Sequence, residues 1–164
     1  MKLKNYLRIG FIVLLLLLNV SVPNGIVKIS EQTLFNVKKM DFYNRALSQD
    51  FSVELLIECL YYEKIQHPTI VLKQSRLETG HYTSELFKMA NNLFGMRLAH
   101  VRETVAIGEY NYHACYSHWT ESVKDYKLWQ DYYISQGYRL TNYFAFLQYI
   151  GYAEDPIYLL KICS

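Results

Sequence analysis

The residue best placed for chemistry is Glu78, which lies in the last turn of a helix predicted over residues 68–79. Pro68 suits the first helical position, because its missing N–H would lack an intrahelical partner there, and Gly80 suits the left-handed position just past the end. A carboxylate in the last turn meets the partial negative charge of the helix dipole. If it is also partly buried, its pKa rises, and a carboxyl group still protonated near neutral pH can act as a general acid. A solvated glutamate at an ordinary helix end would fit the same local pattern.

Glu78 belongs to the first of four short sequence blocks that follow one another along the chain. They are Ser-Arg-Leu-Glu-Thr-Gly at 75–80, Asn-Asn-Leu-Phe-Gly-Met at 91–96, Tyr116, and Glu-Ser-Val-Lys-Asp-Tyr at 121–126. In this order they resemble the glucosaminidase family of bacterial cell-wall hydrolases (glycoside hydrolase family 73). The family pattern is a Glu followed by a small residue and Gly, an Asn-Leu-Phe-Gly run, a Tyr, and a Ser-x-x-Asp-Tyr helix. The resemblance extends over residues 50–162, and residues 152–158 are similar to the carboxy-terminal part of the family.

The resemblance implies cleavage of a β-1,4 bond after N-acetylglucosamine in peptidoglycan, with Glu78 protonating the leaving glycosidic oxygen. It also implies that the loop at 91–95 forms one wall of the glycan cleft. The candidate substrate-binding residues are Asn91, Asn92, Phe94, Gly95 and Ser75. A Tyr at the position of Tyr116 is associated with the reaction in this family, and its phenol could orient the acetamido group or the water. Plain packing of Tyr116 in a hairpin is the alternative.

A second catalytic group is expected because positive charge develops on the sugar in the transition state. In lysozyme-like domains a β element commonly lies across the groove from the catalytic helix, and Glu103 and Glu109 are the carboxylates in that segment. We favour Glu103, although neither residue sits in a clear family motif and each could be a solvated loop charge. The acetamido group of the substrate or a positioned water could take this role instead.

The hydrophobic pattern predicts a mainly helical α+β fold, and the resemblance makes it a lysozyme-like domain with a small β-hairpin lobe. Besides the helix that carries Glu78, helices are expected at 31–48, 53–65, 82–89, 118–134, 141–150 and 156–162. Two short strands are expected at 104–107 and 112–116, with the turn at 108–111. The aromatic stripe of helix 118–134 is a core face, and Ser122 and Asp125 on that helix are expected to be structural.

Residues 1–25 have the three parts of a secretory signal: basic residues up to Arg8, an apolar run from Ile9 to Val22, and a Pro-Asn-Gly turn. The apolar run is shorter than the roughly 20 residues that span a bilayer comfortably. We expect export to the periplasm, the cell envelope or the medium, with the segment either cleaved or retained as a membrane anchor. A leading helical segment at 26–50 and the glucosaminidase domain at 51–164 would follow.

Three of the 17 basic residues and none of the 15 acidic residues lie in residues 1–25, so the remaining domain is near neutral. It has no basic field of the kind that binds nucleic acid. The cysteines, Cys59, Cys115 and Cys163, lack metal-ligand spacing, and Cys59 and Cys115 are expected to be buried free thiols. No metal or organic cofactor is expected, because hydrolysis by an acid-assisted route needs neither.

Three other functions are compatible with the sequence. A module that binds glycan without cleaving it would keep the groove but lack a working second group. A lytic transglycosylase would use one carboxylic acid and leave anhydro-muramyl ends. A membrane-tethered interaction protein would keep its amino terminus and have no affinity for glycan. We expect the chain to act as a monomer on the glycan strands of peptidoglycan.

Overall fold

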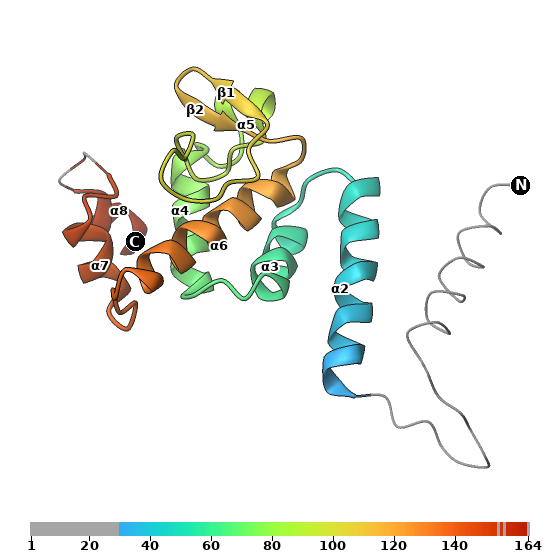
Figure 1. Cartoon of the computed structure of the whole chain (residues 1–164). Helices are drawn as coiled ribbons and strands as arrows, with labels where there is room; N and C mark the ends of the chain where they lie inside the picture. Colours follow the sequence, from blue (N-terminus) through green and yellow to red (C-terminus); the bar gives the residue numbers. More distant parts are fainter. Residues whose placement is uncertain (1–29, 154, 156, 164) are drawn as a thin grey trace, which may run out of the picture. The chain divides into compact units, whose positions relative to one another are not determined.

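The computed structural model describes residues 30–153, 155 and 157–163. In chain order they form the elements labelled in Figure 1: helices α2 (Glu31–Ser48), α3 (Val53–Tyr62), α4 (Pro68–Glu78) and α5 (Glu85–Ala90), strands β1 (Gly108–Tyr110) and β2 (His113–Cys115), and helices α6 (Trp119–Ser135), α7 (Tyr143–Tyr149) and α8 (Tyr158–Cys163). The predicted mainly helical α+β fold with a small hairpin lobe is confirmed. Within the described part of the chain, no helix is long and apolar enough to cross a membrane. The predicted secretory signal or anchor at 1–25 lies outside the described residues.

The chain divides within α2 into one unit of residues 1–38 and a compact unit of residues 39–164. In the compact unit, the last part of α2 packs into the core through Phe42 and Ala46, which are fully buried. The ring of Phe42 lies 5.2 Å from that of Tyr62 at the end of α3, measured between centroids. The boundary predicted after residue 50 follows this packed part of α2, and the domain limits remain a prediction.

Helix α6 crosses the compact unit and contacts α3, while α4 contacts both α3 and α8 (Figure 1). The predicted core stripe of α6 is confirmed, since its members are buried or pack on the core with partial exposure: Trp119, Val123, Tyr126, Trp129 and Tyr133. The helix also buries polar side chains: Thr120, Ser122, Asp125 and Gln130. Buried polar groups need hydrogen-bond partners. These side chains therefore fix which segments can pack against α6.

The hairpin differs from the predicted one in the position of its first strand. β1 and β2 pair antiparallel with Gly108 opposite Cys115, so residues 108–110, predicted as turn, form a strand, and residues 104–107 form none. The turn is instead Asn111-Tyr112, whose φ angles are 48° and 63°. Tight two-residue hairpins favour positive φ at both central positions, and asparagine adopts it more readily than most residues. The prediction was wrong because it placed the turn at Gly108.

Two helices are shorter than predicted because left-handed residues interrupt them. α3 ends at Tyr62 instead of continuing to residue 65, and Lys64 has a φ of 54°. α5 begins only after Ser84, whose hydroxyl caps the helix by accepting the Phe87 amide, while Tyr82 has a φ of 66°. The remaining helices start and end within two residues of their predicted limits.

Two cysteines in the described residues are free thiols, and they differ in exposure. Cys59, on the buried side of α3, is fully buried, as predicted. Cys115 is partly exposed, because it lies at the end of a two-stranded hairpin where side chains have solvent on one side. The prediction of burial therefore holds for Cys59 alone.

The carboxylate of Asp125 ties α6 to the segment 97–116, called the β lobe below. Its oxygens accept hydrogen bonds from the Arg102 guanidinium at 3.1 and 2.8 Å and from the Tyr116 hydroxyl at 3.0 Å. The side chains of Arg102 and Asp125 are 7% and 0% exposed. Burial acts to raise the pKa of Asp125, but hydrogen bonds from Arg102, Thr104 and Tyr116 outweigh it, and the pKa is lowered. Arg102 and Asp125 therefore form a hydrogen-bonded ion pair inside the domain.

We expect Arg102→Met to lower the free energy of unfolding by about 3–5 kcal/mol, because it leaves a buried carboxylate without its cation. Urea denaturation at pH 7 measures this. Lys127→Met is the matched control, since it breaks an exposed ion pair with Asp131 and should cost under about 1 kcal/mol. Because the pKa of Asp125 is lowered on folding, its contribution is present above the ordinary aspartate pKa of about 3.9 and is lost as the pH falls through the folded value. Equal losses in the two variants would contradict the assignment.

Candidate active site

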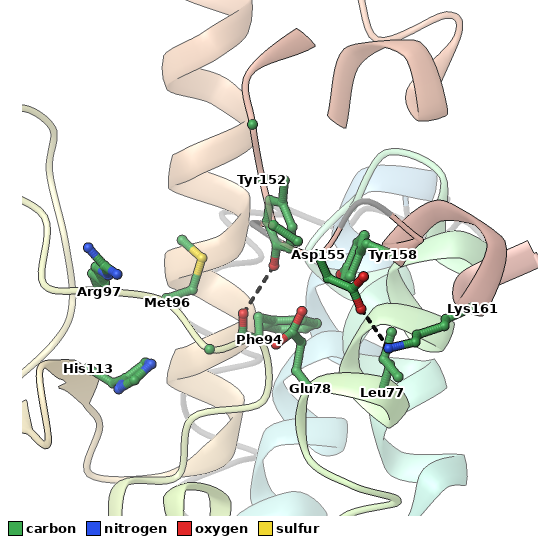
Figure 2. Close-up of a pocket in the computed structure, with 13 residues that line it drawn as sticks. Leu77, Glu78, Phe94, Met96, Arg97, His113, Tyr152, Asp155, Tyr158 and Lys161 are labelled. Carbon is green, nitrogen blue, oxygen red and sulfur yellow. Dashed lines mark hydrogen bonds and ion pairs between the residues drawn. The ribbon is translucent and has the colours of Figure 1, made fainter. Parts of the chain in front are cut away.

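A cleft of about 680 Å³ opens at the carboxy-terminal end of α4. Its walls come from α4, the loop after α5, β2, and the segment that leads into α8. Figure 2 shows Glu78 between Arg97 and His113 on one side and Leu77 and Lys161 on the other. The lining residues are Leu77, Glu78, Phe94, Gly95, Met96, Arg97, His113, Gly151, Tyr152, Ala153, Asp155, Tyr158 and Lys161.

Local helix signals place Glu78 at this cleft. Pro68 is the first residue of α4, as the sequence predicts, and Glu78 lies in the predicted last turn as its final residue. Beyond the end, Gly80 has a φ of 53°, and its amide donates to the carbonyl three residues back at 3.1 Å. The next amide, that of His81, donates to the carbonyl five residues back at 2.8 Å. This pair of bonds forms a Schellman motif, which ends the helix and turns the chain away immediately after Glu78.

The carboxyl group of Glu78 is half-buried, and its protonation is shifted accordingly. Burial raises the pKa of Glu78, while a hydrogen bond from Tyr158 and the charge of His113 partly oppose that rise. The net direction is upward, so the carboxyl group keeps its proton to a higher pH than a solvated glutamate does. The expected raised pKa of Glu78 is therefore present, and its main cause is loss of solvation.

Gly95 lets the loop 91–96 pass close to this carboxyl group. A Cβ at Gly95 would lie 3.0 Å from Oε2 of Glu78, and the residue has a φ of 62°. Both the close approach and the left-handed backbone favour glycine at this position. The glycine of the Asn-Leu-Phe-Gly block thus brings the cleft wall against the candidate acid.

Asn92 holds the same loop from inside the protein. Its Oδ1 accepts two amides of its own loop at 3.2 and 3.1 Å, and its Nδ2 donates to the carbonyls of Met96 and Ala114 at 2.9 and 2.8 Å. Ser122 of α6 accepts the Leu93 amide at 3.0 Å. The loop is therefore fixed to β2 and to α6 by buried hydrogen bonds, and the cleft wall is a rigid part of the fold.

A chain of buried hydrogen bonds leads from α6 to Glu78. Its successive distances are 2.8, 2.7, 2.9 and 3.2 Å, and its members in order are Gln130, Tyr143, Tyr126, Gln74 and Tyr158. The Gln74 carbonyl accepts from Tyr126 and the Gln74 amide donates to Tyr158. The Tyr158 hydroxyl is therefore an acceptor toward Gln74 and keeps its own proton to donate to Glu78. The donor that faces the carboxyl group is thus oriented by side chains from α6, α7 and α4.

The predicted site residues separate into those that line the cleft and those that do not. Glu78, Phe94 and Gly95 line it. Ser75, Asn91, Asn92 and Tyr116 do not line it and are bonded within the protein. Tyr116 is 1% exposed with its hydroxyl on Asp125, Asn91 donates to the Tyr116 carbonyl at 3.0 Å, and Ser75 donates to the Leu72 carbonyl at 2.8 Å.

The two candidate second carboxylates are both exposed and are not among the residues that line the cleft. Glu103 follows Arg102, whose guanidinium donates to the Glu103 backbone carbonyl at 2.7 Å. Glu109 lies in the middle of β1, opposite Ala114. The hairpin does reach the cleft, but it contributes His113 there.

The structure adds side chains that sequence reasoning did not select as site residues: Arg97, His113, Tyr152, Asp155, Tyr158 and Lys161. A signal for three of them was present, because the segment 152–158 resembles the carboxy-terminal part of the family. The Tyr152 hydroxyl donates to the Phe94 carbonyl at 3.0 Å, as Figure 2 shows, and so braces the wall beside Glu78. No local pattern marks Arg97 or His113, whose position depends on how the hairpin packs.

Asp155 brings a second carboxylate to the cleft, but its oxygens are committed. Oδ1 accepts the Ile157 amide at 2.9 Å, and Oδ2 pairs with Lys161 at 2.5 Å (Figure 2). The hydrogen bond from Lys161 lowers the pKa of Asp155. Of the two carboxyl groups among the described lining residues, Asp155 therefore supports the start of α8, while Glu78 is the one available as a proton donor.

Removing the Tyr158 hydroxyl should raise the pKa of Glu78 further, because that hydrogen bond favours the charged carboxylate. Carboxyl-carbon NMR titration of Tyr158→Phe measures the change. Tyr149→Phe is the control, since Tyr149 is 78% exposed and does not line the cleft. A pKa that stays fixed or falls in Tyr158→Phe would show that the hydroxyl does not stabilise the carboxylate.

Gly95→Ala should destabilise the fold more than Gly151→Ala does. Both glycines have nearly the same left-handed φ, 62° and 61°, so both variants carry backbone strain of about 1 kcal/mol. A Cβ at Gly151 meets nothing within 4 Å, whereas at Gly95 it presses on Glu78. Denaturant unfolding of the two variants isolates that contact, and equal stabilities would mean that Glu78 moves aside without cost.

The comparison with known proteins identifies a family. The family model described as mannosyl-glycoprotein endo-beta-N-acetylglucosaminidase matches residues 55–164. No curated protein and no solved structure gives a match. The matched region contains α4 with Glu78, the loop 91–96, the β lobe, α6 and every residue that lines the cleft. The fold and the match together confirm the predicted lysozyme-like α+β domain. The chain therefore belongs to the glucosaminidase family and carries a peptidoglycan-degrading glycosidase domain.

Proposed function

We propose that the protein is an endo-β-N-acetylglucosaminidase that cleaves β-1,4 bonds in peptidoglycan with Glu78 as general acid. The observation that carries the proposal is the state of Glu78: a half-buried carboxyl group, with its pKa raised by burial, in an open cleft. A glycosidic oxygen is a poor leaving group unless it is protonated. A carboxylic acid with a raised pKa keeps its proton to a higher pH than a solvated one and can supply it as the bond breaks.

The surroundings of Glu78 support both halves of such a reaction. While Glu78 is protonated, loss of solvation favours its neutral form. Once the proton is given to the leaving oxygen, the hydrogen bond from Tyr158 and the charge of His113 favour the carboxylate. The same carboxylate can then accept a proton from the attacking water. Because these influences on the pKa oppose each other, Glu78 can give up its proton in the first step and take one back in the second.

The second catalytic group, which stabilises the positive charge on the sugar, is proposed from the chemistry of the substrate. Of the described lining residues, only Asp155 offers another carboxylate, and its two oxygens are bonded to Ile157 and Lys161. We propose that the acetamido group of the substrate or a water held in the cleft meets the positive charge on the sugar. Glu103 and Glu109 remain candidates only if the β lobe approaches the bound glycan. Tyr116 would act as a positioning residue, since its hydroxyl is bonded to Asp125.

The candidate binding residues divide into those that line the cleft and those that are hydrogen-bonded inside the protein. Phe94 and Gly95 would contact the glycan directly, because they line the cleft. Asn91, Asn92 and Ser75 would support the wall through their internal hydrogen bonds. The expected setting is an exported monomer acting on peptidoglycan strands, with the segment 1–25 as a signal or anchor.

A lytic transglycosylase is the second candidate, because it needs only one carboxylic acid. The observation that favours it is that Asp155, the other carboxyl group among the described cleft residues, is held by Lys161, which leaves Glu78 as the one available acid. The two reactions leave different ends: hydrolysis gives reducing ends, and transglycosylation gives anhydro-muramyl ends. Analysis of the products by mass spectrometry separates them.

Glu78→Gln should reduce the release of N-acetylglucosamine reducing ends from purified peptidoglycan by at least about a hundredfold, because the side chain keeps its shape and loses the acid proton. Glu31→Gln is the control, since it removes an exposed carboxylate outside the matched region. Retained turnover in Glu78→Gln would refute the assignment of the acid. An inactive wild-type protein that still sediments with cell walls would replace the enzyme by a glycan-binding module.

A further inference from the structure

A second hollow, of about 350 Å³, adjoins the cleft along α4. It is called the basic groove below, and its lining residues are Lys73, Arg76, Leu77, Gly80, His81 and Lys161. Leu77 and Lys161 line the cleft as well, so the two hollows share a wall. Figure 2 places both residues on the same side of Glu78. The basic groove therefore begins beside the carboxyl group proposed to act on the glycan.

The basic groove continues into a third hollow, of about 500 Å³, that is more apolar. The two share Lys73, Arg76 and His81, and the third hollow is completed by Val53, Thr69, Leu72 and Tyr82. A ligand that leaves the cleft past Leu77 would thus meet cationic side chains first and an apolar recess afterwards. The order of these surfaces limits the kind of ligand that fits.

The charge of the basic groove is one-sided. No acidic residue is among its lining residues or among those of the third hollow, within the described part of the chain. Lys73 and Arg76 lie three residues apart on one face of α4, where like charges repel. Lys161 pairs with Asp155 on the cleft side. The helix dipole favours a cation near the end of α4, which explains Arg76. It does not explain why Lys161 of α8 and His81 of the following turn converge on the same hollow.

We propose that the basic groove binds the carboxylates of the peptide stems of peptidoglycan, and that the third hollow receives their apolar side chains. This proposal rests on the proposed function. In peptidoglycan the stem is attached to the muramic acid that adjoins the cleaved N-acetylglucosamine bond, so it must leave the cleft close to the scissile bond. A guanidinium binds a carboxylate with two parallel hydrogen bonds, and an ammonium adds a point charge. The groove would thus select glycan that carries stems over bare glycan.

The test measures binding without turnover, using the full chain with Glu78→Gln. Soluble glycan strands with intact stems are compared with the same strands after the stems have been removed. Adding Lys73→Gln and Arg76→Gln should weaken binding of stem-bearing strands about tenfold or more and leave binding of bare strands unchanged. Binding of stem-bearing strands should also weaken as salt is added, because the groove is exposed.

The control is the pair Lys88→Gln and Arg139→Gln in the same background. Both residues are exposed, neither lines the three hollows, and the change in net charge is the same. Binding that falls equally in both double variants, or equally for both kinds of strand, would overturn the proposal. Thermal melting checks the fold, and if the double variant melts lower, Arg76→Gln alone carries the same comparison.

Phosphate-rich wall polymers share the anionic chemistry of the stems. If Lys73→Gln and Arg76→Gln weaken binding only of strands that still carry such phosphates, the groove recognises phosphate and the stem proposal fails. Turnover is read separately with Glu78 intact. If Glu78→Gln proves as active as the wild type while stem-dependent binding persists, the assignment of the acid fails and the basic groove stands.

Discussion

The structure depends on one buried carboxylate, that of Asp125 in the middle of α6. A carboxylate without solvent must be paired and hydrogen-bonded, or it costs several kcal/mol. Arg102 and Tyr116 provide those partners from the two ends of a segment that contains the hairpin. Three residues earlier on α6, Ser122 accepts the Leu93 amide and so fixes the loop that carries Phe94 and Gly95. One turn of α6 thus determines where the β lobe and the cleft wall lie.

Burial shifts the pKa values of two acidic side chains, Asp125 and Glu78, to opposite net outcomes. Asp125 has its charge matched by Arg102, and its lowered pKa means that it stabilises the fold above the ordinary aspartate pKa. Glu78 meets burial without a comparable cation, and its pKa is raised. A raised pKa means that its favourable contribution is present below the ordinary glutamate pKa of about 4.3 and is lost as the pH rises through the folded value. Loss of solvation therefore disfavours the ionised form of Glu78, which keeps the proton on the carboxyl group until a substrate oxygen accepts it.

Tyrosines of the core support the site of Glu78. The rings of Tyr126 and Tyr143 belong to the core, while their hydroxyls form part of the chain that ends on Tyr158. Phe94 packs on the ring of Tyr126 with centroids 4.4 Å apart, so the same side chain supports the cleft wall from behind. An amphipathic ring is suited to this double use, since its body packs and its hydroxyl still finds a partner. The many tyrosines of this sequence are explained largely by such positions at the edge of the core.

The sequence by itself determined the features that depend on neighbouring residues. The Pro68 start and the Gly80 end of α4 fix Glu78 in the last helical turn, and the spacing of Trp119, Val123 and Tyr126 fixes the buried face of α6. The ordered family blocks also identified the fold and the family. These follow from backbone preferences and periodicity, which act over a few residues.

Only the tertiary structure decided which side chains meet across the cleft. Tyr116, Glu103 and Asn92 belong to motifs or segments near the site in sequence, yet none lines the cleft, whereas His113, Tyr152 and Lys161 do. The hairpin turn also lies at a different position from the predicted one, because Asn111 and Tyr112 accept positive φ once the strands pair. Direction and desolvation of a side chain depend on segments tens of residues away, and those are set by the packing around α6. The raised pKa of Glu78 is of this kind, because it comes from burial among groups that the local sequence does not specify.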